Sequence, residues 1–384
     1  MARLVEAIGR HRRGELSGGE AAELLGMSER HFRRLRDRYA ADGAAGIVDR
    51  RLGKASSRRV PVDRIAWVLD QYRTRYADFT VKHFHEHLVR DHRFALSYSW
   101  VKDQLQAHGV VRKAAKRGAH RRKRERRPLP GMLPFQDGSP HAWLPGGGAL
   151  DLIVTLDDAT SEIYPAFLVE EEGTASSFRG LLETIAAKGL FPSLYTDRGS
   201  HYFTTPKAGG RVAKESLTQV GRALAQLGIE HIPAYSPRAR GRMERLFGTL
   251  QGRWPQELRL AGFTDDPAAA NRFIREVLVP RHNARFAVAP ALPGSAFVAY
   301  AGGDLADVLC VQTERVVGTD NTVRYRGMTL QIPESPLRRH SVKVTVRGHD
   351  YPDGRPALFH GPRRIARYDR NGRLEAEQPD QIAA

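Results

Sequence analysis

The apolar positions of the first 45 residues follow the spacing of two short helices joined by a glycine turn. Ser17 can cap the first helix and Ser28 the second, on either side of Gly26. The second helix carries a basic face, and its candidate DNA-binding residues are Arg30, Arg33, Arg34 and Arg36. This pattern predicts a helix-turn-helix DNA-binding domain over residues 1–45. The alternative is a helical hairpin with a solvated charged face.

Residues 60–111 return to helical periodicity after a linker rich in Gly, Ala and Arg. Ser99 can cap the last of these helices, and Lys102 and Gln106 would face outward. We expect a second helical DNA-binding domain here. The stretch also contains four histidines: His83, His85, His87 and His92. Because no cysteine or paired-ligand spacing accompanies them, we expect surface or DNA-facing roles rather than a metal site.

From residue 130 to residue 300 the pattern changes to strands that alternate with helices. Five strands are expected, at residues 132–136, 150–156, 163–169, 190–196 and 229–233. Ser236 and Pro237 are a helix-start signal, and the helix that follows buries one apolar face with Glu244 at its edge. Three consecutive strands followed by alternating helices and strands predict an α/β RNase H-like core, with helices on both faces of a mixed sheet. We expect the helix after Asp266 to end before Pro280.

Short alternating strands fill residues 308–372, separated by turn signals. They are expected at residues 313–317, 322–325, 328–332, 341–346, 357–360 and 364–368. This spacing predicts a small β-barrel. The fold class is therefore multidomain: N-terminal all-α helix-turn-helix modules, a central α/β RNase H-like core and a C-terminal small β-barrel.

Charge points to a polyanionic partner. The chain has 61 Lys and Arg against 43 Asp and Glu, a formal net charge of +18. Such an excess suits nucleic acid, although ribosomal and membrane-surface proteins share it. The single cysteine excludes an intramolecular disulfide framework and fits a reducing cytosol. Because the sequence has neither an apolar run of membrane-spanning length nor a signal peptide, we expect a cytoplasmic, nucleoid-associated prokaryotic protein with no membrane partner.

Positive charge is densest between the second helical module and the core. Residues 112–129 contain the run RKAAKRGAHRRKRERR, from which we select Arg121, Arg122, Lys123 and Arg124 as candidate DNA-binding residues. Self-repulsion would extend this linker, and DNA phosphates would bind it. The alternative is a solubilising tether.

Three acids are candidates for metal-assisted chemistry on phosphodiesters. Asp197 follows a buried strand, Glu244 lies on the packed helix, and Asp137 follows the first strand of the core. Hard divalent cations prefer carboxylate oxygens, and a pair of them can clamp the attacking and leaving oxygens. Asp157 and Asp158 compete with Asp137 for this role.

The local strings FQDGSPHAWL, LDDAT, YTDRGSHYF and SPRARGRMERLFGTLQGRW resemble those of DDE transposases in the insertion-sequence group called ISNCY. The resemblance covers residues 132–254 and implies an integrase-type catalytic core. It places the acidic triad, both catalytic and metal-binding, on Asp137, Asp197 and Glu244. The 46 residues between Asp197 and Glu244 exceed the usual family spacing, so an insertion lies there. Arg198 stands where integrases often carry Asn.

The resemblance implies a DNA transposase that uses two Mg²⁺ (or Mn²⁺) for strand cleavage and strand transfer. Its partners would be double-stranded DNA, both element ends and target, and further copies of the chain in a homo-oligomer on DNA. Arg198 and Arg240 are candidates to steady the scissile phosphate; alternatively they only offset the acidic cluster. Two other functions remain open: an RNase H-like nuclease without strand transfer, and a non-catalytic DNA-binding regulator derived from a transposase.

Overall fold

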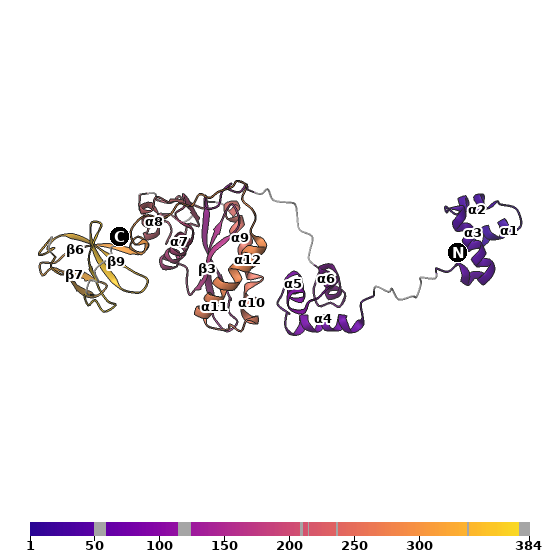
Figure 1. Cartoon of the computed structure of the whole chain (residues 1–384), viewed down its shortest axis with the longest axis horizontal. Helices are drawn as coiled ribbons and strands as arrows, with labels where there is room; N and C mark the ends of the chain where they lie inside the picture. Colours follow the sequence, from indigo (N-terminus) through magenta and orange to yellow (C-terminus); the bar gives the residue numbers. More distant parts are fainter. Residues whose placement is uncertain are drawn as a thin grey trace. The chain divides into compact units, whose positions relative to one another are not determined.

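The computed structural model of this chain describes residues 1–49, 59–113, 124–207, 210–213, 215–235, 237–335 and 338–375, without the side chains of 237–240. It divides into two compact units, residues 1–71 and 72–384. Figure 1 shows the helices and strands along the chain. Among the described residues, every helix is too short or too polar to cross a membrane.

The first unit opens with three helices, α1 (Ala2–Arg12), α2 (Gly18–Leu24) and α3 (Glu29–Asp42). Ser17 and Glu20 form a reciprocal capping box at the start of α2, and Ser28 caps α3 by accepting from the backbone of His31. Both predicted caps are therefore confirmed. The helices share a small core made by Ala7, Ile8, Ala21, Ala22 and Phe32. The sequence pattern did not predict α1, which supplies two of these core residues.

A 3₁₀ turn (Gly43–Ile47) follows α3, and α4 (Val62–Thr74) ends the first unit and enters the second. The next helices are α5 (Val81–His92) and α6 (Tyr98–Ala107). Ser97 caps α6, so the prediction of Ser99 as the cap was wrong; the Ser97 hydroxyl accepts from the backbone of Trp100 at 3.3 Å. The expectation for the histidines of α5 also needs correction, because His83 and His87 are buried.

The centre of the second unit is a five-stranded mixed sheet in the order β3-β2-β1-β4-β5. Its strands are β1 (Pro134–His141), β2 (Leu150–Asp157), β3 (Ile163–Val169), β4 (Ser193–Thr196) and β5 (Glu230–Pro233). The first three strands are antiparallel neighbours, whereas β4 runs parallel to β1 and to β5. This is the mixed α/β sheet that the sequence predicts. Asp137 lies inside β1 rather than after it, because β1 pairs with β2 along its whole length.

Helices cover the sheet with two separate apolar cores. On one face Phe135 and Tyr195 pack with α9 (Pro237–Gln251), whose buried side chains are Met243, Leu246, Phe247 and Leu250. On the other face Leu194 packs with α7 (Thr174–Lys188) and α8 (Gln219–Gln226). Because side chains alternate along a strand, odd-numbered residues of β1 and β4 face α9 and even-numbered ones face α7.

The chain stays helical after α9 through α10 (Trp254–Leu260), α11 (Pro267–Phe273), a π-helical segment (Ile274–Leu278) and α12 (Val279–Phe286). The helical run therefore passes Pro280, and the prediction that it ends before this residue was wrong. Pro280 lies in the first turn of α12, where an α-helix does not need the missing N–H.

The C-terminal part is antiparallel β-structure, as expected. Strands β6 (Val311–Val316), β9 (Thr345–Asp350), β10 (Pro356–His360) and β11 (Arg363–Arg367) form a sheet in the order β11-β10-β9-β6. A hairpin of β7 (Thr322–Tyr325) and β8 (Met328–Gln331) shares its core. The strand expected at 341–346 begins only at Thr345, because Lys343 has a positive φ of 61° in a turn.

Candidate active site

Asp137 lies on β1, and Asp197 directly follows β4, the parallel neighbour of β1. Phe135 of β1 is paired with Tyr195 of β4, and their rings make an edge contact at 5.1 Å between centroids. Each Asp stands two residues beyond its aromatic residue, so alternation directs both carboxyl groups to the face that α9 covers. Asp137 is 5% exposed, and Asp197 Oδ1 accepts from the backbone N–H of Gly199 at 2.8 Å.

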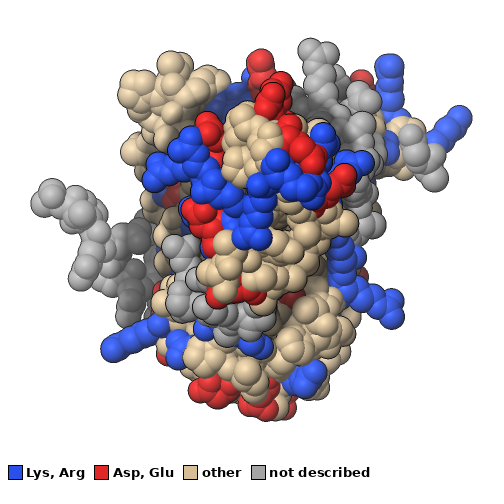
Figure 2. Space-filling model, turned by 90° about the vertical axis from the view of Figure 1, so that its right-hand side faces the viewer, with Lys and Arg blue, Asp and Glu red and all other residues tan. Residues whose placement is uncertain are grey.

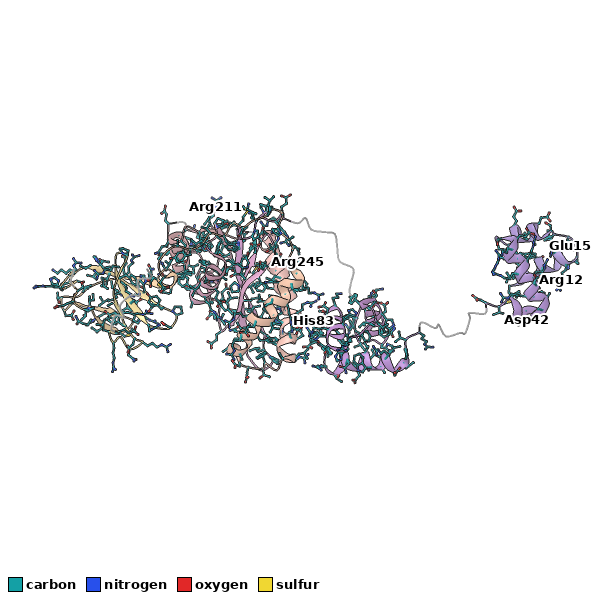
Figure 3. All side chains as sticks on the ribbon, in the orientation of Figure 1. Arg12, Glu15, Asp42, His83, Arg211 and Arg245 are labelled. Atoms are coloured by element: carbon teal, nitrogen blue, oxygen red, sulfur yellow. The ribbon has the colours of Figure 1, made fainter. Side chains whose placement is uncertain are left out.

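Glu244 lies on α9, the helix that crosses this same face. Gln251 Nε2, two turns after Glu244, donates to Ser139 Oγ on β1 at 3.0 Å. In the first half of α9, Arg242 pairs with Asp158, which lies just beyond β2. These two contacts hold α9 along β1, with Glu244 between them and its side chain exposed. Figure 3 labels Arg245, which follows it on the same helix.

Three further side chains surround the aspartates, and the sequence pattern did not single them out. Glu172 Oε1 lies 3.5 Å from His201 Nε2, and the buried ring of Tyr202 lies against His201. Burial raises the pKa of Tyr202 well above its usual value, and the charges of Glu172, Asp137 and Asp197 raise it further. The Tyr202 hydroxyl therefore stays protonated beside an acidic cluster. Glu172 belongs to a run of three glutamates with no distinguishing spacing, so no sequence signal marked it.

The two competing acids are occupied by contacts within the fold. Asp157 accepts from the backbone N–H groups of Gly131 and Thr160, each at 2.8 Å. Asp158 pairs with Arg124 and Arg242 and is fully buried. These contacts give both carboxylates a structural role.

Two of the candidate arginines near the core, Arg198 and Arg124, have described contacts. Arg198 donates to the backbone carbonyl of Gly210 at 2.6 Å and lies over the ring of Tyr235. Arg124 contacts the core: it forms an ion pair with Asp158 and lies over the ring of Phe135. The side chain of Arg240 and residues Arg121, Arg122 and Lys123 lie outside the described residues.

The candidate DNA-binding residues of α3 lie on its outer side. Arg30, Arg33 and Arg34 are exposed, and Arg36 is half-buried against Asp37 and His11. Basic and acidic side chains lie interspersed on the face shown in Figure 2. In the second unit, Lys102 is half-buried and lies 3.5 Å from Asp103, and Gln106 is half-buried on α6.

A helix-turn-helix module and a mixed α/β core with clustered acids are typical of proteins that act on DNA. Residues 5–63 match the family described as winged helix-turn helix. The chain is 32% identical to the "Putative transposase y4bF" of Sinorhizobium fredii, over 91% of this chain and 77% of that protein. It therefore belongs to this family of transposases. It is also 34% identical to the transposase for insertion sequence IS1202 of Streptococcus pneumoniae, over 35% of this chain and 29% of that one.

Viral integrases are among the similar solved structures. A simian T-cell lymphotropic virus intasome in complex with PP2A regulatory subunit B56 gamma matches 69% of this chain and 89% of its own, with a TM-score of 0.34 and 15% identity. The HTLV-2 integrase catalytic core domain in complex with magnesium matches 38% of this chain and 82% of its own, with a TM-score of 0.28 and 15% identity.

Proposed function

We propose that this transposase is a DDE-type enzyme of the ISNCY group that cleaves and joins DNA with Asp137, Asp197 and Glu244. The observation that carries the proposal is the strand register. Phe135 and Tyr195 are paired on the parallel strands β1 and β4, and each Asp follows its aromatic residue by two positions. Glu244 lies two turns before Gln251 on α9, and Gln251 donates to Ser139 of β1. We further propose that the mixed sheet is an RNase H-like core, supported by its strand order and its helices on both faces.

The donor set fits magnesium. Carboxylate oxygens are the ligands that Mg²⁺ and Mn²⁺ prefer. Burial and the charge of Glu172 raise the pKa of Tyr202, and the nearby charges of Asp137 and Asp197 raise it further. We propose that these two residues and Glu244 hold two such ions. When bound, the ions would neutralise phosphate charge and make water or a 3′-hydroxyl a better nucleophile.

The proposed reaction has two steps, and neither needs a nucleophilic side chain. Hydrolysis adds water across a phosphodiester at the element end and leaves a free 3′-hydroxyl. That hydroxyl then attacks a target phosphodiester, forming one P–O bond while another breaks and releases a target 3′-hydroxyl. The role of this chain is to position both strands and to balance their charge. The loop after β4, which carries Arg198 and His201, lies beside Asp197 and would contact the scissile strand.

DNA recognition would be divided among the modules. We propose a helix-turn-helix domain at 1–45, a second helical DNA-binding domain at 60–111 and a basic linker at 112–129. The catalytic core would span 130–300, followed by a small β-barrel at 308–372. Terminal inverted repeats would be bound by the helical modules and target DNA by the core. Because two element ends must be joined together, the active form would be a homo-oligomer on DNA.

The test is cleavage and joining of DNA from the ends of the element, with Mg²⁺ or Mn²⁺. Asp197→Asn and Glu244→Gln should each reduce cleavage by at least about a thousandfold, because each removes a charged oxygen ligand. Binding of end DNA, measured by gel shift, should change less than threefold. Glu276→Gln, which alters an exposed glutamate elsewhere in the core, is the matched control.

Metal-dependent cleavage that survives in both Asp197→Asn and Glu244→Gln would overturn the catalytic assignment. Cleavage without joining would identify a nuclease. Binding of end DNA without cleavage by the wild type would identify a regulator.

A further inference from the structure

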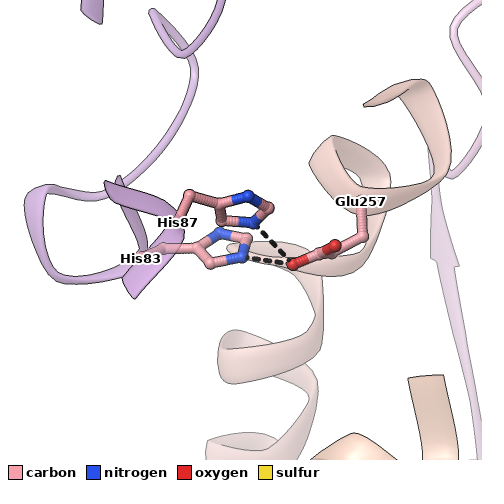
Figure 4. Close-up of side chains that lie close together, drawn as sticks. All are labelled: His83, His87 and Glu257. Atoms are coloured by element: carbon pink, nitrogen blue, oxygen red, sulfur yellow. Dashed lines mark hydrogen bonds and ion pairs between the residues drawn. The ribbon is translucent and has the colours of Figure 1, made fainter. Parts of the chain in front are cut away.

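Two imidazoles and one carboxylate meet between α5 and α10 (Figure 4). His83 and His87 lie one turn apart on α5, and the Nε2 atom of each lies 2.8 Å from the same oxygen, Oε1 of Glu257. The three ligand atoms lie within 4.8 Å of one another. His83 is 2% exposed, His87 1% and the Glu257 side chain 13%. This cluster is separate from the acids on the central sheet.

Hydrogen bonding within the described residues leaves part of this cluster unsatisfied. The buried His83 Nδ1 has no described hydrogen-bond partner. His87 Nδ1 lies 2.8 Å from Asp91 Oδ2 and 2.9 Å from Arg90 Nη2. The Nε2 atoms of both rings face one carboxylate oxygen, Oε1 of Glu257, so a cation placed among these three atoms would be bound by all of them.

We propose that His83, His87 and Glu257 form a zinc site that joins α5 to α10. Two imidazole nitrogens and one carboxylate oxygen are a known zinc ligand set, with the fourth position left to water. Asp91 would act as the carboxylate that orients His87 through Nδ1. Magnesium is excluded as the preferred ion because it favours oxygen ligands.

The ligand atoms need only a small movement to bind the ion. With zinc–ligand bonds of about 2.0–2.1 Å in a tetrahedral site, ligand atoms lie about 3.3 Å apart. The two nitrogens are at 2.8 Å from Oε1, so an outward shift of about half an ångström accommodates the ion. The solvent side is a cleft lined in part by Glu86, Arg281 and His282, through which the fourth ligand could enter.

Contacts around the cluster already hold the two helices together. Arg253 forms a bidentate ion pair with Glu86, with N–O distances of 2.7 and 3.1 Å. Arg259 pairs in the same way with Asp78, at 2.7 and 3.2 Å. The His83 ring stacks on Phe79 with centroids 4.3 Å apart. The ligands are thus placed before the ion arrives, which lowers the cost of binding it.

The experiment uses the full chain, stripped with a chelator and then titrated with Zn²⁺ while excess Mg²⁺ occupies oxygen-ligand sites. We expect one Zn²⁺ per chain by calorimetry and elemental analysis, and a rise in Tm on binding. Co²⁺ in the same site should give the visible absorption of a tetrahedral ion. His83→Gln/His87→Gln should abolish binding, Glu257→Gln should weaken it at least tenfold, and Asp91→Asn should weaken it about 10–100-fold.

His85→Gln is the matched control, because His85 lies on the same helix but contacts the backbone carbonyl of Leu96. It should bind Zn²⁺ like the wild type. Wild-type protein that takes up no more Zn²⁺ than His83→Gln/His87→Gln would overturn the proposal, and this comparison stands even if the Glu257 variant fails to fold. Purified protein that carries iron instead would overturn the zinc assignment. None of these outcomes depends on DNA cleavage, so they are independent of the proposed catalytic function.

Discussion

The face of the sheet to which Asp137 points is set by the alternation of side chains along β1. Shifting β1 by one residue would turn the Asp137 carboxyl group to the α7 face. The Phe135–Tyr195 pair sets this register, because both rings belong to the apolar core under α9. The acids and the core are thus positioned by the same packing.

His349 is a buried histidine, and neither of its ring nitrogens has a hydrogen-bond partner among the described residues. Burial, and then the nearby charges of Arg347 and Arg222, lowers the pKa of His349 to about 4. The folded chain therefore keeps this ring neutral, whereas the unfolded chain protonates it near pH 6.5. Stability that is complete above pH 6.5 should fall as the pH is lowered toward 4, by up to about 3 kcal/mol.

Urea unfolding at a series of pH values measures this effect. In His349→Leu, the free energy of unfolding should decrease less between pH 6.5 and pH 4 than it does in the wild type. His340→Leu, which replaces an exposed histidine, should leave this decrease unchanged. A part of the slope should remain in both variants, because burial also lowers the pKa of His231 and of His282 to about 4. An unchanged slope in His349→Leu would contradict the assignment.

Helix α3 presents its arginines because capping and core packing fix its rotation. Phe32 and Leu35 are buried, so Arg30, Arg33 and Arg34 point outward. The winged helix-turn-helix match over residues 5–63 agrees with this arrangement.

Replacing Arg34 with Ala should therefore weaken binding to end DNA. If Arg34 contacts a phosphate, the slope of log K against log salt should also fall by about 1. Fluorescence anisotropy at several salt concentrations measures both quantities. Arg272→Ala on α11 is an exposed-arginine control and should leave affinity and slope unchanged. If the two variants behave alike, α3 is not part of the DNA interface.

Asp158 connects segments that are far apart in the chain. It lies just beyond β2, pairs with Arg242 on α9 and Arg124 before β1, and accepts from the backbone of Arg127 at 2.7 Å. Arg124 and Arg127, the described end of the basic linker, are thereby attached to the core. Asp158 is fully buried, so its negative charge is tolerated in the folded chain only because the two arginines pair with it.

Asp158→Ala should lower the free energy of unfolding by about 3–5 kcal/mol, because it leaves two arginines without their shared partner. Asp265→Ala, an exposed acid elsewhere in the core, should change it by less than about 0.5 kcal/mol. Chemical denaturation measures the free energy of unfolding of both variants and of the wild type. Equal effects would show that Asp158 does not anchor α9.

Local patterns in the sequence were sufficient for the features that depend on neighbouring residues. Ser17 and Ser28 cap their helices as predicted, and β3 has the predicted ends. Side-chain hydrogen bonds to the next turn and two-residue alternation are short-range effects, so they can be deduced from adjacent positions.

The sequence by itself also determined the charge excess and the kind of core, but only the tertiary structure decided which distant residues meet. His83 and His87 were expected at the surface, and nothing near them in the chain indicates Glu257, 170 residues beyond His87. Asp158 and Arg242 are 84 residues apart. Such pairs depend on how helices and strands pack, and packing is set by the summed burial of many side chains rather than by any local pattern.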